Sequence, residues 1–260
     1  MSDPSGQSAA LATHGGPARW YRVRWRLLLP LLLLLTLLGG RTLYRQHQQQ
    51  RAKAQLDAWN VPYRTQPIAP PAAWWLPPAL ADEIVEVYWR DPDLDERRLA
   101  LLVPLSTIEK LELSTAPLTP SGLRMIARLR RLDTLHLDGT TVTDEGLIEL
   151  VGLQGLRVLS LDDTKVTDEG LRWLARLRQL ERLSLNGTRV SDAGLGHLVS
   201  LSNLKELSLV GTQITDASLV HLARLRRLEL LKLHHTQVTL EGMQRLHAAL
   251  PQCVIWLPSE

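Results

Sequence analysis

The fold of this chain is decided by residues 156–179, which read LRVLSLDDTKVTDEGLRWLARLRQ. The next 24 residues, 180–203, read LERLSLNGTRVSDAGLGHLVSLSN and keep the apolar positions at the same spacing. Working outward, the pattern L-x-x-L-x-L-x-x-T-x-V-T-D-x-G-L-x-x-L-x-x-L-x-x recurs along the chain. Close copies begin at Leu132, Leu156, Leu180, Leu204 and Leu228, and looser copies begin at Ile84 and Ile108. A period of this length predicts a solenoid of stacked units.

Each copy combines a strand pattern with a helix pattern. In residues 183–185 apolar and polar side chains alternate, which predicts a strand with one buried face. Leu171, Leu174 and Leu177 recur every three residues, which places them on one side of a helix. A copy buries about seven apolar side chains, each contributing about 1.5–3 kcal/mol, and ordering its residues costs at least as much. We therefore expect the copies to stack, with a parallel sheet inside an arc and helices outside.

Polar residues occupy three further positions in nearly every copy. The hydroxyl residue before each helix is expected to cap free backbone N–H groups, and the aspartate after it favours the positive end of the helix dipole. The threonine after each strand is expected to bond the backbone of the turn. The caps are Thr143, Thr167, Ser191, Thr215 and Thr239, the aspartates are Asp144, Asp168, Asp192 and Asp216, and the turn residues are Thr140, Thr164, Thr188, Thr212 and Thr236.

These units resemble the leucine-rich repeat family, in particular the bacterial T-x-V-T-D-x-G-L type. They are similar to the ribonuclease-inhibitor-like and cysteine-containing subfamilies. The resemblance covers about seven repeats and a closing strand within residues 84–260. It implies a right-handed α/β horseshoe that binds other macromolecules, usually proteins, on its concave face. The chain departs from many relatives in having Thr where they have Cys or Asn, and in lacking an F-box and paired capping cysteines.

Charge is divided unevenly along the chain. Residues 1–83 hold 9 basic and 4 acidic side chains, whereas residues 84–260 hold 21 basic and 23 acidic ones, a formal net charge of −2. The repeat domain therefore lacks the basic footprint of a nucleic-acid-binding domain. The single cysteine, Cys253, excludes an internal disulfide and a thiolate-rich metal site, and we expect it to be buried in the closing strand.

Residues 19–40 are predicted to meet a membrane, after a small polar tail (residues 1–18) that is expected to be disordered. Four arginines and three aromatic residues precede an apolar run at residues 27–38, as at a membrane interface. As a helix the run covers about 18 Å, less than a bilayer core of about 30 Å. A cleaved signal peptide and an uncleaved signal anchor with snorkelling arginines both fit this pattern.

The residues after the run favour the anchor. Leu38 lies where signal cleavage requires a small side chain, and Gly39 and Gly40 are followed at once by Arg41. Basic residues flank the run on both sides, so the positive-inside rule does not fix the orientation. We expect a single-pass membrane protein whose repeat domain lies outside the cytoplasm, as is the habit of N-terminal anchors. A secreted protein after signal cleavage is the alternative.

Residues 41–83 are predicted to form a juxtamembrane helix followed by a stalk. Residues 41–60 are rich in Gln, Arg and Ala, and six prolines within residues 62–78 predict a semi-rigid extended spacer. Trp74 and Trp75 come just before the first copy, where an end repeat would otherwise expose its leucines. We expect these tryptophans to form a lid, with a partner-binding aromatic patch as the alternative.

The inner face of the arc carries the candidate binding residues, because the third, fifth and seventh positions of each copy point inward. An acidic group lies at one end of this face (Asp138, Asp162 and Asp163) and a basic group at the other (Lys232, His234 and His235). Neighbouring acids could hold a divalent cation, but solvated acids are far commoner, and no nucleophile or enclosed pocket accompanies the histidines. The candidates are Tyr88, Glu112, His136, Asp138, Ser160, Asp162, Asp163, Ser184, Asn186, Ser208, Lys232, His234, His235 and Trp256.

We therefore predict a non-enzymatic, membrane-tethered module without cofactor or metal, whose monomeric repeat domain binds a protein partner on the concave face. No phosphate-binding glycine loop, G-x-S-x-G or H-E-x-x-H motif is present. The alternatives are the secreted form, an envelope spacer, and an enzyme with a concave-face site. The sequence A-R-L-R recurs at 127–130, 175–178 and 223–226 and predicts an outer stripe, either solvated or docked on anionic lipid or an acidic partner.

Overall fold

The computed structural model describes residues 19–68 and 81–256, with side chains from residue 39 onward. The chain divides into two compact units, residues 1–44 and residues 45–260. Helix α1 (Arg19–Ala58) contributes to both. Among the described residues, no helix is long and apolar enough to cross a membrane. The side chains of the apolar run at residues 27–38, together with Trp74 and Trp75, lie outside the described part of the chain.

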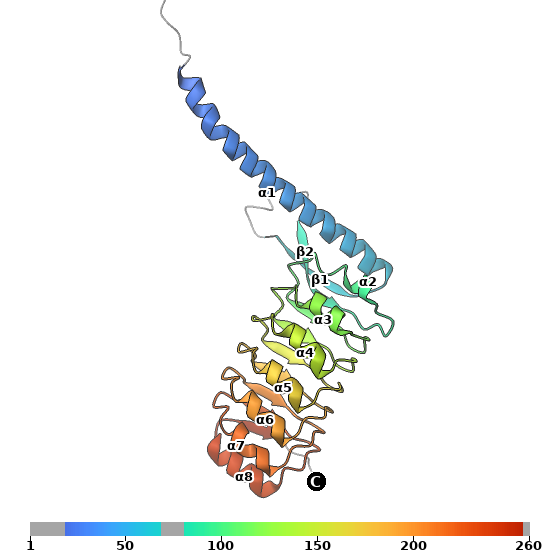
Figure 1. Ribbon diagram of the computed structural model, residues 1–260, viewed down its shortest axis with the longest axis vertical. Coiled ribbons are helices and arrows are strands. Elements are labelled where there is room, and N and C mark those ends of the chain that lie inside the picture. The colour runs from blue at the N-terminus through green and yellow to red at the C-terminus, as the bar shows by residue number, and fades with distance from the viewer. Residues whose placement is uncertain (1–18, 69–80, 257–260) are drawn as a thin grey trace, which may run out of the picture. The chain divides into compact units, whose positions relative to one another are not determined.

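The second unit is built on one nine-stranded sheet whose strands follow their order in the chain (Figure 1). The first pair is antiparallel and every later pair is parallel. The strands are β1 (Tyr63–Pro67), β2 (Asp82–Tyr88), β3 (Lys110–Glu112), β4 (Thr134–His136), β5 (Val158–Ser160), β6 (Arg182–Ser184), β7 (Glu206–Ser208), β8 (Leu230–Lys232) and β9 (Val254–Trp256).

The register of the sheet repeats the 24-residue period of the sequence. From β2 to β9 each residue pairs with the one 24 positions later, as Leu135 does with Leu159 and Leu159 with Leu183. These central leucines are fully buried, whereas their neighbours in each strand face away from the core. The predicted α/β leucine-rich repeat solenoid is therefore confirmed for the repeat region.

Short helices form one layer against the sheet (Figure 1). They are α2 (Glu96–Leu99), α3 (Pro120–Ile126), α4 (Asp144–Leu150), α5 (Asp168–Leu174), α6 (Asp192–Leu198), the 3₁₀ turn η2 (Asp216–Ser218) with α7 (Leu219–Leu222), and α8 (Leu240–Ala249). The 3₁₀ turn occurs where Ser218 replaces the glycine of the other repeats. Its hydroxyl donates to the Thr215 carbonyl, a local bond that competes with regular helix geometry.

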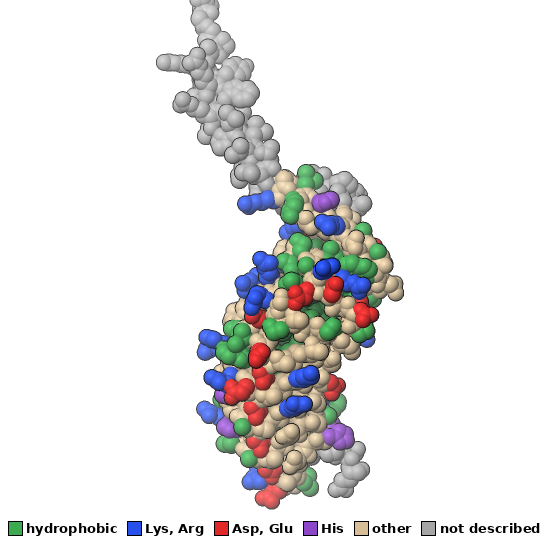
Figure 2. Space-filling model, turned by 45° about the vertical axis from the view of Figure 1, so that its right-hand side comes forward, with side chains coloured by type: hydrophobic (Ala, Val, Ile, Leu, Met, Phe, Trp, Pro, Cys, Tyr) green, Lys and Arg blue, Asp and Glu red, His purple; other side chains and the backbone are tan. Residues whose placement is uncertain are grey.

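A single hydrophobic core runs the length of the second unit, from Ala52 in α1 to Cys253 before β9. Each fully buried leucine in it contributes about 1.5–3 kcal/mol. Cys253 is buried as expected, and burial raises the pKa of its thiol to about 11. Charged side chains of both signs are interspersed over the face of the repeats that Figure 2 shows.

Two sets of hydrogen bonds recur along the solenoid, one within each repeat and one between successive repeats. The threonine after each strand donates its hydroxyl to the carbonyl three residues earlier at 2.6–2.7 Å, which confirms the predicted structural file. The aspartate in the first helical turn also reaches the next repeat. Asp144 accepts from the backbone N–H of Thr167 at 2.8 Å and from its hydroxyl at 2.7 Å, and Asp168, Asp192 and Asp216 bond the next cap in the same way.

This aspartate ladder explains the helix glycines Gly170, Gly194 and Gly242, whereas Gly122 and Gly146 lie against the side chains of Leu99 and Leu123. A Cβ added at Gly170 would lie 2.4 Å from Oδ1 of Asp144, so no larger residue fits while the ladder is formed. Most of the predicted caps also form, since Thr167, for example, accepts from the N–H of Glu169. Thr143 makes no side-chain cap bond. The preceding repeat has Pro120 in place of the ladder aspartate.

The N-terminal end of the repeat stack differs from the predicted stalk. The C-terminal part of α1 buries Gln46, Gln49, Ala52 and Leu56 against the first repeat. Gln49 donates to the Thr107 hydroxyl at 2.9 Å and accepts from the backbone N–H of Ile84 at 3.0 Å. A helix therefore covers this end of the core, and the folded unit begins at residue 45 rather than at the predicted boundary, residue 84.

The predicted extended spacer also begins as part of the sheet. Within it, β1 pairs antiparallel with β2, and Tyr63 lies opposite Val87. The proline-rich sequence permits this because β1 is the edge strand, where a missing N–H costs no ladder bond. Residues 63–67 therefore close the N-terminal edge of the sheet.

Candidate functional site

The concave face holds an open groove of about 610 Å³ that extends across strands β3 to β8. Its floor follows the last residue of each strand, where Ser160, Ser184 and Ser208 stand in register. Ser160 and Ser208 are buried and Ser184 is half-buried. Because these side chains are short, the middle of the face is a trough with longer side chains around it.

The predicted central file is confirmed as a row by the strand register. Tyr88, Glu112 and His136 precede the serines, and Lys232 and Trp256 follow them, each paired with its counterpart one repeat away. Each strand contributes one residue to this row, and the residue type changes along the sheet. The register therefore places the serine floor between two ends of the row. Tyr88 and Glu112 lie at one end, and Lys232 and Trp256 lie at the other.

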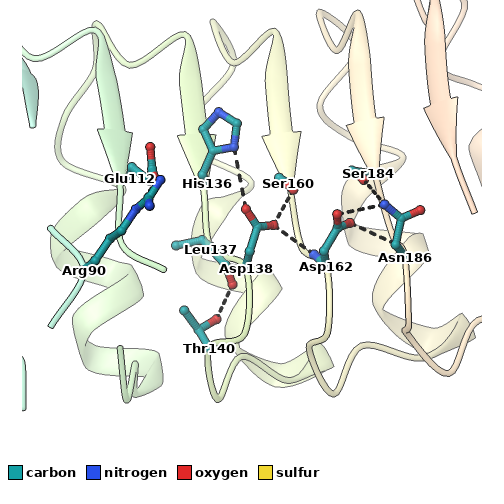
Figure 3. A network of polar contacts seen from close by, with 10 residues as sticks. All are labelled: Arg90, Glu112, His136, Leu137, Asp138, Thr140, Ser160, Asp162, Ser184 and Asn186. Atoms are coloured by element: carbon teal, nitrogen blue, oxygen red, sulfur yellow. Dashed lines mark hydrogen bonds and ion pairs between the residues drawn. The ribbon is translucent and has the colours of Figure 1, made fainter. Parts of the chain in front are cut away.

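A polar chain lies beside this row (Figure 3). Asp138 accepts from the Ser160 hydroxyl and from the backbone N–H of Asp162, the latter at 3.1 Å. Asp162 accepts from the backbone N–H and the side-chain amide of Asn186 at 2.9 and 2.8 Å. The amide oxygen of Asn186 continues the chain. It accepts from the hydroxyl of Ser208 at 2.6 Å and from the backbone N–H of Val210 at 2.8 Å. These side chains join neighbouring repeats, and Asp162 and Asn186 also line the groove.

The pKa of Asp138 reflects these bonds. Burial would raise it, but the interactions with His136, with the Ser160 hydroxyl and with the Asp162 N–H together lower the pKa below its ordinary value. Nδ1 of His136 lies 3.8 Å from Oδ2 of Asp138. The carboxylate thus lies between hydroxyl and imidazole, whereas a serine nucleophile needs the imidazole next to the hydroxyl. This arrangement therefore does not provide an imidazole that could activate the Ser160 hydroxyl as a nucleophile.

The acidic group is only partly assembled as predicted. Asp138 and Asp162 lie on the concave face, but Asp163 occupies the following turn with φ of +54° and is exposed. The prediction placed it on the face because it adjoins Asp162 in sequence. Gly187 and Gly211 have the same turn conformation one and two repeats later. In the described part of the chain, no group of three or more His, Cys, Asp or Glu side chains could hold a metal.

The basic end is likewise divided between face and turn. Lys232 places its ammonium 5.2 Å from the centre of the Trp256 ring, and His234 meets the same ring edge-on at 6.4 Å. Trp256 keeps 49% of its surface exposed. His235, predicted with this group, lies in the turn with φ of +55°. The structure therefore brings together one lysine, one histidine and one tryptophan.

At the opposite end, the predicted residues are engaged with neighbours. Glu112 pairs with Arg90 one strand away. The Tyr88 hydroxyl donates to Glu86, and this bond is the main cause that raises the pKa of Tyr88 and lowers that of Glu86. Lys110 lies 4.9 Å from the centre of the Tyr88 ring.

The groove includes a file of side chains that the predicted site lacks. These are the third residues of the repeats, which the alternation places inward but which carry no obvious chemical pattern. Arg182 is exposed in the middle of this file, and its side chain makes no hydrogen bond or ion pair of 4.0 Å or less with any described residue. In the sequence, only its place as the third residue of its repeat indicates that Arg182 faces the groove. The file in the groove consists of Lys110, Thr134, Val158, Arg182, Glu206 and Leu230.

Comparisons with known proteins found one family model and several solved structures that are similar to parts of this chain. A family model described as "Leucine Rich repeat" matches residues 200–223. An internalin C2 from Listeria monocytogenes str. 4b F2365 is 31% identical over 62% of this chain and 66% of its own, with a TM-score of 0.49. A leucine-rich repeat protein from Leptospira interrogans is 23% identical over 60% of this chain and 39% of its own, with a TM-score of 0.48.

The match thus spans slightly less than two thirds of the internalin and about two fifths of the Leptospira protein. A comparison with curated proteins returned no match. The 24-residue sheet register and the match of a leucine-rich repeat model at residues 200–223 agree on a leucine-rich repeat architecture for the repeat region.

Proposed function

We propose that the repeat domain is a non-enzymatic protein-binding module and that its partner enters the concave groove. The observation that carries this proposal is the open trough of about 610 Å³ over the serine file. Its floor is polar and short, and Arg182 and Glu206 project from neighbouring strands beside it without a partner among the described residues. Such side chains are available to an incoming protein, whereas those of the aspartate ladder are already bonded.

Charge and aromatic groups around the trough would orient the partner. Lys232 and His234 lie at one end, and Asp138 and Asp162 of the polar chain lie toward the other. Complementary charge of this kind contributes more to orientation and association rate than to affinity. The half-exposed Trp256 is suited to anchor the partner, because aromatic side chains often dominate interface energies.

A charge placed in the trough tests the proposal. Ser184→Arg fills the middle of the groove with a long side chain and should abolish partner capture, scored by affinity purification from the cells that make the protein. The matched control is Gln213→Arg, which adds the same residue at an exposed position where the preceding repeat already has Arg189. Circular dichroism checks that both variants fold. Loss of capture in the control but not in Ser184→Arg would contradict the concave-face assignment.

We also propose that the N-terminal segment tethers the domain to a membrane as an uncleaved, single-pass anchor, with the repeats outside the cytoplasm. The support is the apolar run at residues 27–38, with arginines and aromatic residues before it. The full-length protein should sediment with membranes, resist carbonate extraction and keep its original N-terminus. A soluble species that begins near Arg41 would support the secreted alternative instead.

A further inference from the structure

One edge of the repeat stack concentrates arginine. The connections that lead from each helix into the next strand lie at the edge where the strands begin. Five of them, residues 127–133, 151–157, 175–181, 199–205 and 223–229, contain nine arginines and one lysine against three acidic residues, Asp133, Glu181 and Glu229. The opposite edge, where the helices begin, carries the aspartate ladder. The two edges of the solenoid therefore differ in charge.

Some of these arginines have a structural role. Arg130 donates to the carbonyl of Gly152 at 2.8 Å, and Arg226 donates to that of Ala249 at 3.1 Å, so both bond the end of the next helical segment. Arg131 and Arg227 contact Glu109 and Asn203. These four side chains are explained by the packing of neighbouring repeats.

Four others, Arg128, Arg176, Arg178 and Arg224, are not explained in this way, and three of them share one repeat position. Arg128, Arg176 and Arg224 are exposed, and their side chains make no hydrogen bond or ion pair with any residue that the structure describes. We call them the arginine row. They occur in every second repeat, so their separation is about 10 Å, two strand spacings. A helix dipole favours a cation here, but the intervening repeats fold in the same way with Gly152 and Ser200 at this position.

The N-terminal segment joins the domain at the same edge. Arg45, the first residue of the second unit, pairs at 2.9 Å with Glu83 near the start of β2. Lys53 donates to the carbonyl of Asp82, the first residue of that strand, at 3.1 Å. The chain that precedes Arg45 includes the apolar run at residues 27–38. A membrane held by that run would therefore be attached to the domain at its arginine-rich edge.

We propose that the arginine row docks the repeat domain on anionic lipid headgroups, with its concave groove left accessible. This inference rests on the proposed membrane tether, which would keep the edge close to the bilayer. Each arginine near an anionic surface multiplies the docking constant by about fivefold, and three together by about a hundredfold. The free guanidinium groups donate hydrogen bonds to phosphate in a planar fork, which suits lipid phosphates.

The test compares full-length protein in neutral phosphatidylcholine vesicles and in vesicles that also contain phosphatidylglycerol. Hydrogen–deuterium exchange at residues 127–131, 175–179 and 223–227 should slow in the anionic vesicles, and the protection should decline as salt is added. The variant Arg128→Gln/Arg176→Gln/Arg224→Gln should lose about a hundredfold in docking constant and exchange as it does in neutral vesicles. A control with the same loss of charge elsewhere, Lys165→Gln/Arg189→Gln/Arg245→Gln, should remain protected.

The outcomes separate docking from tethering. Stable insertion into both vesicle types without protection in the anionic ones would overturn docking and leave the tether intact. Salt-sensitive protection with anionic vesicles, but no association with neutral ones, would support docking and contradict the tether. Equal losses in the arginine-row variant and the control would overturn the assignment to this row. Protection by an added acidic protein but not by anionic vesicles would overturn it in favour of a protein contact.

Discussion

At the residue scale, one repeat position on the concave face both joins neighbouring repeats and contributes to the surface that a partner would meet. Asp138 and Asn186 occupy the same position in repeats 48 residues apart, and both accept from a serine hydroxyl and from a backbone N–H of the next repeat. What the fold requires at this position is an acceptor, not a negative charge. Charge can therefore vary here with the needs of binding while the repeats remain joined.

Replacing Asp138 with Asn tests this separation. The lowered pKa of Asp138 means that the folded protein binds its proton less readily than the unfolded chain. The carboxylate therefore stabilises the fold above the ordinary aspartate pKa of about 4, and this contribution is lost as pH falls through the lower, folded value. Asp138→Asn should fold normally at neutral pH, because the amide oxygen can accept the same bonds as in Asn186.

Thermal unfolding measured from pH 7 down to pH 3 checks the prediction. The melting temperature of the wild type should fall more steeply than that of Asp138→Asn in the acid range. Asp163→Asn is the control, since this exposed carboxylate lies in the turn; its acid profile should follow the wild type. Parallel profiles for the wild type and Asp138→Asn would mean that the carboxylate does not contribute as described.

Spacing in the sequence was enough to predict the serine file, because strand alternation and a 24-residue period fix which residues share a row. It was not enough for Asp163 and His235, since adjacency does not reveal a left-handed turn. Nor did it identify Arg182 as a candidate. What distinguishes this groove residue is that its side chain makes no hydrogen bond or ion pair with a described residue. Hydrogen bonds and missing partners depend on geometry between repeats, which a one-dimensional pattern does not contain.

At the element scale, the unexpected part of the fold is the cap formed by α1. Among the side chains of α1 that the structure describes, four are buried and two of these are glutamines, so an apolar pattern could not identify the buried face. Gln49 is tolerated there because Ile84 and Thr107 satisfy its amide. The Pro-rich sequence after the helix was interpreted as a spacer, although Pro67 lies in the antiparallel edge strand β1. Contacts with the first repeat therefore determine both the buried face of α1 and the formation of β1.

Substitutions on the buried face should show that this helix stabilises the domain. Leu56→Ala should lower the free energy of unfolding by about 2–5 kcal/mol through the cavity that it leaves. Gln49→Ala should cost about 1–3 kcal/mol because the buried N–H of Ile84 loses its acceptor. Urea unfolding followed by circular dichroism measures both.

The exposed neighbour Gln55 provides the matched control. Gln55→Ala should change the stability by no more than about 0.5 kcal/mol. If Leu56→Ala and Gln49→Ala were equally neutral, the C-terminal part of α1 would not act as the cap of the repeat stack. A protein lacking residues 1–80 should then also unfold at the same temperature as the full chain, whereas the cap predicts a lower one.

At the scale of the whole molecule, the repeat domain has faces and edges with different roles. Its outer helices expose apolar side chains such as Ile148 and Val220, its edges differ in charge, and its concave face contains the groove. The central claim is that a protein partner occupies this groove. This claim predicts that the partner contacts the concave face and no other surface. Mapping which residues contact the partner therefore tests it.

Site-specific photo-crosslinking measures the position of contact most directly. A photoreactive p-benzoylphenylalanine replaces Arg182 or Glu206 in the groove and, in matched variants, Ile148 or Val220 on the outer helices. After irradiation of the cells that make the protein, the groove positions should give a discrete partner adduct and the outer positions should not. The same adduct from the outer positions, with none from Arg182 or Glu206, would contradict the account.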